Sequence, residues 1–256
     1  MTTTVCDLEN GIITADTRWS AIFPLNDGNE LILYCDDTTF DKICIVGKAA
    51  LLTAGDGTLI AKWKEWWMND RNPTTRPITD NALGENAVNL AIVDLVNNDV
   101  IFDAGQKNAL FCLQTNVIKA FAAGSGGIHA ASHLLNTGCA ISAVKEASKE
   151  DYYTGSEVKF LNFDTTQNNL EPATYDYGKI VNGLIKRGRV MTKQANTPTD
   201  VGLKVQDHPL YSDMKKALKT GQAIASAPVP GLSRFKWTND TEKKFTEAMD
   251  RVAELT

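Results

Sequence analysis

The sequence predicts an α+β protein in which two stacked sheets lie between layers of helices. Short runs rich in β-branched residues, separated by turns, fill the first 55 residues. Apolar residues at helical spacing then appear in two places, each after a group of strands. This order of strands, two helices, strands, two helices and strand is typical of sheets packed face to face with helices outside.

The first strands are predicted from a hairpin signal and from β-branched runs. Asn10-Gly11 separates two such runs, and this dipeptide is a strong signal for a β-hairpin. Further apolar and β-branched runs follow before Asp56. The predicted strands cover residues 2–7, 12–17, 29–36, 40–46 and 49–55.

Two helices are predicted next. From Asp56 onward apolar residues recur at helical spacing, and Asp56 is placed to cap the first helix. A second amphipathic helix is predicted from Asn81 to Val96. The positions that define these helices are Leu59, Ile60, Trp63, Trp66 and Trp67, and then Leu83, Val88, Ile92 and Leu95.

Strands then return and are followed by a second pair of helices. A glycine-rich run at residues 124–127 precedes the third helix, and the sequence Asn-Thr-Gly at Gly138 is a typical helix stop. The predicted strands cover 99–104, 108–114, 117–124 and 154–163, and the fourth helix runs from Ile141 to Asp151.

The chain after residue 167 is predicted to be an extension of a core domain at residues 2–167. Residues 168–256 are expected to hold two helices that pack on this domain or on a neighbouring subunit. The first ends at Gly221, and a turn-rich linker follows at 226–233. Asn239 and Glu242 resemble a capping box for the last helix, whose Phe245, Met249 and Val252 form a docking surface.

The composition excludes several classes of function. The net charge is -5 and no long run has one sign, which argues against nucleic acid as the main partner. The uncharged stretch between Lys119 and Lys145 is too rich in Gly, Ser, His and Asn for a membrane span. Without an apolar signal region, and with five widely spaced cysteines that we expect to be reduced, the sequence predicts a cytoplasmic protein.

No metal or cofactor is predicted. His129 and His133 are four residues apart on a predicted helix, but no glutamate follows the first histidine and no third ligand is evident. The glycine-rich run lacks the full dinucleotide-binding pattern, so helix capping by Ser125 is the simpler interpretation of that serine.

Thr2 raises a chemical question, because removal of Met1 would make it the first residue. A free α-amino group has a pKa of about 8 and can therefore accept the proton of its own threonine hydroxyl, directly or through a water. Such a residue is a nucleophile that carries its own base. The mechanism also needs a nearby cation, a carboxylate that holds the cation, and a backbone N–H that faces the oxyanion.

Several motifs, in order, resemble the proteasome β-subunit family of N-terminal nucleophile hydrolases, which includes a bacterial heat-shock protease that partners an unfoldase. They are "TTTV" with "NGIITADTR", "FDKICIV", "LLTAGDG", "AAGSGG" and "EDYYTGS", and they span residues 2–165. The first hairpin is about two residues shorter than is usual in the family, Ser156 replaces a glycine, and the C-terminal extension is longer than in the simplest bacterial members.

The resemblance implies a four-layer α-β-β-α sandwich and a set of site residues. Thr2 would be the nucleophile, with Asp16 and Lys42 beside it, although Lys48 competes for the lysine role. A turn cap for Asp16 and an exposed strand charge for Lys42 are the alternatives. By the same resemblance, Gly55 would supply the oxyanion N–H, and the assisting residues would be Ser125, Asp151 and Thr154.

The function implied by the resemblance is that of a threonine peptidase in a self-compartmentalising homo-oligomeric ring. Its substrates would be peptides or unfolded proteins, and the family allows an ATP-driven unfoldase as partner. Two alternatives stay open: a catalytically inactive scaffold or binding subunit of the same fold, and an amidohydrolase that acts on a small amide.

Retention or loss of Met1 distinguishes the active protein from the inactive scaffold, because a retained Met1 blocks the amine of Thr2. We expect intact-mass spectrometry of the purified protein to give a mass lower than that of the full chain by one methionine residue. A single species that retains Met1 would contradict the peptidase prediction.

Overall fold

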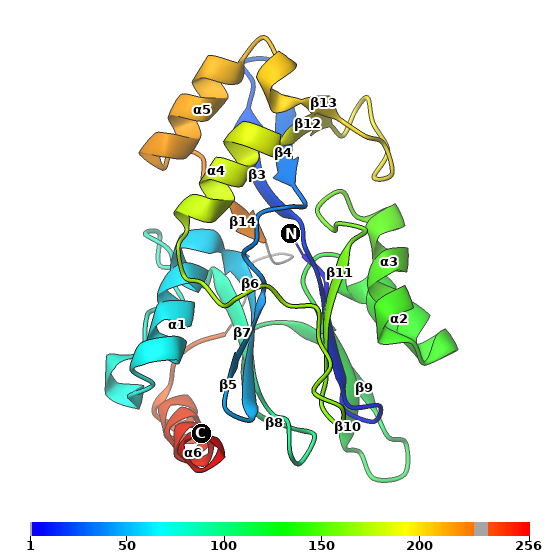
Figure 1. Ribbon diagram of the computed structural model, residues 1–256, viewed down its shortest axis with the longest axis vertical. Helices are drawn as coiled ribbons and strands as arrows, with labels where there is room; N and C mark the ends of the chain where they lie inside the picture. The colour runs from blue at the N-terminus through cyan, green and yellow to red at the C-terminus, as the bar shows by residue number, and fades with distance from the viewer. Residues whose placement is uncertain (1, 228–234) are drawn as a thin grey trace.

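The computed structural model describes residues 2–227 and 235–256. Within these ranges the chain is a mixed protein of α-helices and two antiparallel sheets, with six α-helices in the described part. None of the described helices is long and apolar enough to cross a lipid bilayer. Figure 1 shows the two sheets side by side in the middle, with helices on either side.

The smaller sheet contains the N-terminal hairpin. Its five strands lie in the order β11-β2-β1-β10-β9. The predicted hairpin is confirmed, with Gly11 at a φ of 58°, but its turn spans residues 8–11 because Asp7 pairs with Ile12. The strands are β1 (Thr4–Asp7), β2 (Ile12–Asp16), β9 (Lys107–Phe111), β10 (Ile118–Ala123) and β11 (Val158–Asn162).

The larger sheet has nine strands and draws on the C-terminal segment as well as the N-terminal half. Its order is β13-β12-β4-β3-β14-β6-β7-β8, and β5 pairs with β6 beside this path. Its strands are β3 (Trp19–Pro24), β4 (Glu30–Cys35), β5 (Ile43–Val46), β6 (Ala49–Asp56), β7 (Val88–Asp94), β8 (Asp99–Ala104), β12 (Arg189–Thr192), β13 (Leu203–Lys204) and β14 (Ser226–Ala227).

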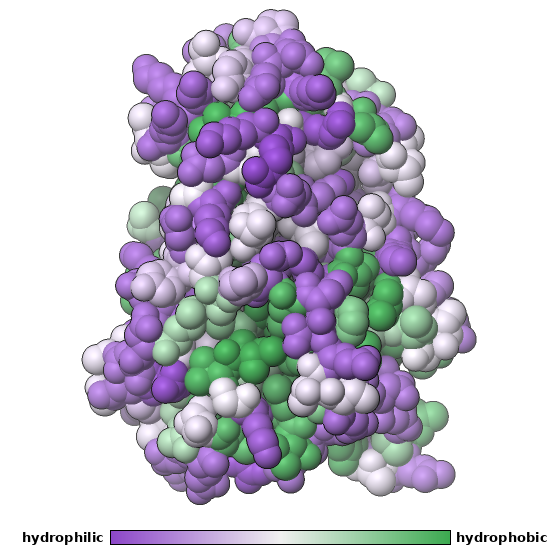
Figure 2. Space-filling view, viewed as in Figure 1, coloured by the Kyte–Doolittle hydropathy of each residue, from purple (hydrophilic) through white to green (hydrophobic). Residues whose placement is uncertain are grey.

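A hydrophobic core holds the two sheets together. Ile13 and Phe121 of the smaller sheet pack in one buried cluster with Leu52 and Val93 of the larger sheet. On the face shown in Figure 2, apolar side chains gather in the lower half, where the two sheets face each other in Figure 1. The two sheets are therefore fixed relative to each other by apolar burial.

Helices cover the outer face of each sheet. Ala130 and Val144 of α2 and α3 pack with Val5 and Ala122 of the smaller sheet. The other helices share one cluster with the outer side chains of the larger sheet. Their bounds are α1 (Gly57–Asn69), α2 (Gly127–Thr137), α3 (Ala140–Glu150), α4 (Gly178–Arg187), α5 (Tyr211–Thr220) and α6 (Asn239–Leu255), with short 3₁₀ helices at Pro73–Thr75 and Val205–Asp207.

The prediction for α1 is confirmed. The carboxylate of Asp56 accepts hydrogen bonds from the backbone N–H groups of Thr58 and Leu59, which otherwise lack partners at a helix start. The tryptophans of the helix are buried against the larger sheet, as their spacing predicts. Asp56 therefore both begins the helix and ends strand β6.

The predicted helix from Asn81 to Val96 is wrong, because residues 81–87 form turns and strand β7 follows from Val88 to Asp94. Every residue of β7 is buried. Val88 and Ile92 face the helices of the larger sheet, whereas Ala91 and Val93 face the smaller sheet. A strand buried on both faces reads as a continuous apolar run, and such a run matches helical spacing by chance.

Boundaries in the C-terminal segment also differ from those predicted. The last helix is capped by Thr238, whose side chain accepts from the N–H of Thr241, so Asn239 is already helical. Of the predicted linker, Ser226 and Ala227 form strand β14 and the rest lies outside the described residues. The elements β3, β12, β13 and α4 were not predicted from the sequence.

Helix α6 is anchored by an aromatic cluster around Phe245. This side chain is fully buried and its ring lies 4.9 Å from that of Phe102 and 6.0 Å from that of Trp63, measured between ring centroids. Trp237 lies 5.3 Å from Phe245 in an edge-to-face arrangement. The C-terminal helix thus packs onto its own chain through the side chains predicted to form a docking surface.

Replacing Phe245→Ala should lower the free energy of unfolding by about 3–5 kcal/mol, because it removes a large buried side chain and leaves a cavity. Glu247→Ala, on the exposed face of the same helix, is the matched control and should change stability by less than about 0.5 kcal/mol. Urea unfolding followed by tryptophan fluorescence measures both. Equal stability of the two variants would show that α6 is not anchored in this way.

Candidate active site

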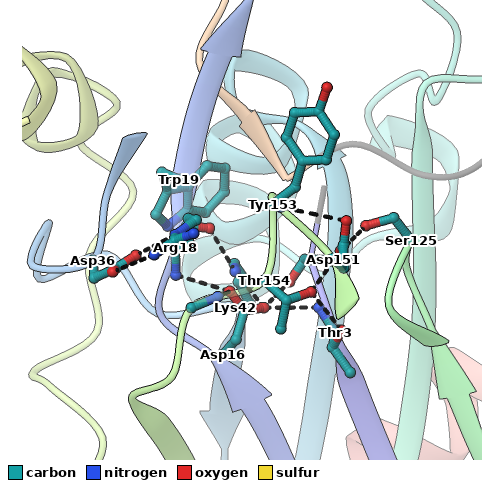
Figure 3. A network of polar contacts seen from close by, with 12 residues as sticks. Thr3, Asp16, Arg18, Trp19, Asp36, Lys42, Ser125, Asp151, Tyr153 and Thr154 are labelled. Carbon is teal, nitrogen blue, oxygen red and sulfur yellow. Dashed lines mark hydrogen bonds and ion pairs between the residues drawn. The ribbon is translucent and has the colours of Figure 1, made fainter. Parts of the chain in front are cut away.

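The carboxylate of Asp16, at the end of β2, is the centre of a buried polar cluster (Figure 3). Its Oδ1 accepts from the hydroxyl of Thr2 at 2.5 Å, from the backbone N–H of Thr3 at 2.7 Å and from Nζ of Lys42 at 2.8 Å. The side chains of Asp16 and Lys42 are fully buried. The structure therefore joins the predicted nucleophile, carboxylate and cation at one oxygen atom.

The second oxygen of the Asp16 carboxylate is held by the backbone. Its Oδ2 accepts from the N–H of Arg18 and from the N–H of Gly155, each at 2.9 Å. With these contacts the carboxylate accepts five hydrogen bonds. A carboxylate accepts several hydrogen bonds and donates none when ionised, so this environment holds the Asp16 side chain in one orientation.

Lys42 is the lysine that reaches the site. It lies just before β5, and its carbonyl accepts from both the N–H and the hydroxyl of Thr53 in the neighbouring strand β6. Its Nζ also donates to the carbonyl of Arg18 at 2.8 Å. Lys48 is exposed in the turn at the other end of the β5–β6 hairpin and donates its N–H to Leu255.

The environment of Lys42 favours its neutral form more than water does. Burial lowers the pKa of the Lys42 ammonium from its usual value, and the charge of Asp16 opposes this shift. The ring of Trp19 lies 5.6 Å from Nζ and is itself fully buried. The carboxylate of Asp16 is therefore the contact that favours the charged ammonium of Lys42 in this buried environment.

A second polar cluster lies on the helix side of the chain start. Ser125 and Thr154 both donate to Oδ2 of Asp151, Thr154 at 2.6 Å. The hydroxyl of Thr154 also lies 2.8 Å from that of Thr3. Ser125 does not cap helix α2, whose N-cap is Gly126 and makes no side-chain hydrogen bond. The three predicted assisting residues are therefore brought together, and their link to the chain start is Thr3.

The alternation of side chains along the chain explains why two clusters meet at its start. Successive side chains of an extended chain point to opposite faces. The hydroxyl of Thr2 therefore points toward Asp16 and the larger sheet, whereas the hydroxyl of Thr3 points toward Thr154 and the helices. Thr3 was not predicted as a site residue. Its role depends on the direction in which its side chain points and not on its being a threonine.

The glycine-rich run packs directly against Thr2 and Thr3. A Cβ on Gly124 would lie 1.9 Å from the carbonyl oxygen of Thr2, and a Cβ on Gly126 would lie 2.2 Å from the hydroxyl of Thr3. Neither distance is compatible with a larger residue. These glycines allow the run to pack closely against the start of the chain. This packing places Ser125 beside Asp151.

Arg18 was missed as a functional residue, although it stands within the quoted motif "NGIITADTR". Its guanidinium binds both oxygens of Asp36, at 2.7 and 2.8 Å, and lies 4.0 Å from the ring centroid of Tyr34. This anchoring holds the backbone of Arg18, whose N–H and carbonyl contact Asp16 and Lys42. Arg18 is therefore a positioning residue.

Gly55, the predicted oxyanion donor, lies in β6 two residues beyond Thr53. Its φ is 129°, and an added Cβ would lie 2.0 Å from the carbonyl oxygen of Ala87. Both facts require glycine at this position. Its backbone pairs with Val88 of β7 on one side and with Ala227 of β14 on the other. Its role in oxyanion binding stays a prediction.

The described residues contain no group of three histidine, cysteine, aspartate or glutamate side chains arranged to hold a metal ion. His129 is exposed, and Nε2 of His133 lies 3.1 Å from the hydroxyl of Ser142. The cysteines are free thiols in the described part of the chain, and Cys6, Cys35 and Cys44 are buried. The polar groups of the candidate site are therefore hydroxyls, carboxylates and the ammonium of Lys42.

Replacing Lys42→Met should lower the free energy of unfolding by about 3–5 kcal/mol at pH 7, since it leaves the buried Asp16 carboxylate without its counter-charge. The double variant Asp16→Asn with Lys42→Met should recover part of that loss. Lys48→Met, on the same hairpin but exposed, is the control and should have little effect. Urea titrations of the four proteins give these values, and equal stability of Lys42→Met and Lys48→Met would contradict the buried pair.

No sequence profile of a known protein family matches the chain, and no curated protein is significantly similar to it. Solved structures do resemble it. One of them, described as Thiobacillus denitrificans BPH in complex with epoxomicin, has 14% sequence identity. The likeness covers 63% of this chain and 97% of the other, with a TM-score of 0.40. A TM-score this low carries no argument about activity, so a proposed function depends on the geometry of the site.

Proposed function

We propose that this protein is a threonine peptidase of the N-terminal nucleophile type, with the four-layer α-β-β-α fold of proteasome β-subunits. The observation that carries the proposal is the buried carboxylate of Asp16, which binds the hydroxyl of Thr2 and the ammonium of Lys42 at a single oxygen. A hydroxyl, a carboxylate and an ammonium in contact are the parts that activation of an N-terminal threonine requires.

The chemistry begins after removal of Met1. The new α-amino group of Thr2 accepts the proton of the Thr2 hydroxyl, and Oγ1 attacks the carbonyl carbon of the substrate. The N–H of Gly55 is proposed to stabilise the oxyanion. The C–N bond then breaks, the leaving amine takes the proton from the ammonium of Thr2, and an ester remains on Thr2. Water hydrolyses this ester and restores the hydroxyl.

The surrounding residues are assigned according to their contacts. Asp16 and Lys42 orient the hydroxyl of Thr2 and stabilise charge near it, because both lie in the buried cluster. Ser125, Asp151 and Thr154 are proposed to hold the new α-amino group, since their network reaches the next residue, Thr3. Peptides or unfolded proteins are the proposed substrates, and a ring of identical subunits in the cytoplasm, with an ATP-driven unfoldase, stays a prediction.

One observation favours a second candidate, the inactive scaffold. In the chain that carries Met1, Thr2 is fully buried and its hydroxyl donates to Asp16. A subunit that keeps Met1 would therefore hold its threonine out of reach of any substrate and act as a non-catalytic member of the assembly. Met1 removal is the step that separates the two candidates.

Replacing Thr2→Ala should lower the rate of hydrolysis of fluorogenic peptides by about 10³-fold or more, because it removes the attacking oxygen. Thr2→Ser keeps a hydroxyl and should keep measurable activity. Thr4→Val is the matched control: the hydroxyl of Thr4 is buried without a hydrogen-bond partner in the described part of the chain, so its loss should leave activity unchanged. Full activity of Thr2→Ala would overturn the proposed function.

A further inference from the structure

Strand β14 is a short piece of the C-terminal segment inserted into the middle of the larger sheet. Ser226 pairs antiparallel with Ser20 of β3 on one side and with Asp56 of β6 on the other, and Ala227 pairs with Gly55. Among the described strands, β14 is the connection between β3 and β6 in the sheet order. The larger sheet therefore has a slot one strand wide, which this chain fills with its own residues (Figure 1).

The residue before β14 is held closely. Ala225 is fully buried, its carbonyl accepts from the N–H of Gly57 at 3.1 Å, and its N–H donates to the hydroxyl of Tyr177 at 2.9 Å. A Cβ on Gly57 would lie 2.4 Å from the carbonyl oxygen of Ala225, so glycine is required for this approach. Both hydrogen bonds use backbone groups of Ala225, and such groups are present in every peptide.

The slot lies close to the candidate active site. Ser20 is two residues beyond Arg18, whose N–H and carbonyl bind Asp16 and Lys42. Gly55 is two residues beyond Thr53, which binds the carbonyl of Lys42. Two residues of a strand span about 7 Å. β14 therefore runs alongside the cluster, and it pairs with Gly55, to which the proposed function assigns the oxyanion N–H.

We propose that β14 is a self-blocking segment: Ser226 and Ala227 occupy the strand position between β3 and β6 that the main chain of an extended substrate of the proposed peptidase would take. This inference rests on the proposed function, because it names where the substrate of that site would lie. An extended peptide added between two strands gains backbone hydrogen bonds on both sides, as in other cases of strand addition. It can do so here only when Ser226 and Ala227 have left.

The size of β14 is compatible with such an exchange. The strand has two residues, and strands in globular proteins usually have about five or six. Ser226 has a small polar side chain and is only partly buried, so its departure exposes little apolar surface. A longer peptide would form more backbone hydrogen bonds than β14 does and would add side-chain contacts. An extended segment of about five or six residues could therefore displace β14.

The first experiment measures binding apart from catalysis. A fluorescent peptide with the sequence of residues 222–227, QAIASA, is titrated with the full chain carrying Thr2→Ala, with or without Ser226→Pro. Proline at this position removes a backbone donor and weakens β14. We expect the peptide to bind the Ser226→Pro protein at least about ten-fold more tightly, in fluorescence anisotropy, because its slot is free. The same peptide with proline in place of its serine should bind weakly.

A milder variant tests the same inference if the proline variant does not fold. Tyr177→Phe removes the hydroxyl that accepts from Ala225 and leaves the slot unchanged, so it should also increase peptide binding. Tyr175→Phe is the matched control because Tyr175 is 41% exposed. If neither Ser226→Pro nor Tyr177→Phe binds the peptide more tightly than its control, the inference is overturned.

Hydrolysis by proteins with Thr2 intact separates this inference from the proposed function. A several-fold higher rate for Ser226→Pro than for the unaltered chain supports both. Tighter peptide binding without hydrolysis by any variant supports the blocked slot and contradicts the peptidase. Equal, Thr2-dependent rates for the unaltered chain and Ser226→Pro support the peptidase and contradict the blocked slot.

Discussion

The buried ion pair of Asp16 and Lys42 is the interaction on which the rest of the site depends. Removing two charges from water costs more free energy than their attraction returns unless further hydrogen bonds hold them. Asp16 meets this condition because it accepts hydrogen bonds from four donors besides Lys42. Lys42 meets it because its Nζ also donates to the carbonyl of Arg18. These donors come from the chain start, from β2–β3 and from the segment before β11, so one pair constrains three distant parts of the chain.

The pair also connects the two sheets. Asp16 ends a strand of the smaller sheet, whereas Lys42 directly precedes a strand of the larger sheet. The apolar core between the sheets sets their separation, and the ion pair sits at the edge of that core beside Thr2. A shift of either sheet relative to the other would break the contact between the ammonium of Lys42 and the carboxylate of Asp16. The packing of the two sheets and the proposed chemistry are thus coupled at the Asp16–Lys42 pair. Strand β14 joins β3 to β6 in the same larger sheet, a short distance from this pair.

Local signals predicted a large part of the fold. The turn at Gly11, the cap at Asp56 and the left-handed stop at Gly138 each depend on a few neighbouring residues, and each was predicted correctly. The helix predicted over β7 was wrong because burial on both faces of a strand leaves no alternation to detect. Strand β14 was missed because two small residues carry no periodic signal, and its structure comes from partners about 170 and 200 residues away in the chain.

The order of residues along the chain was enough to predict which chemical groups are present: a threonine at position 2, an aspartate at the end of a hairpin, a lysine before a strand and a glycine-serine-glycine run. The tertiary structure alone decided that Lys42 and not Lys48 meets Asp16, that Thr3 links the chain start to Asp151 through Thr154, and that Ser226 lies beside Ser20. The physical reason is that side-chain identity and turn chemistry are local properties, whereas contacts between distant segments follow from how two sheets bury their apolar faces against each other.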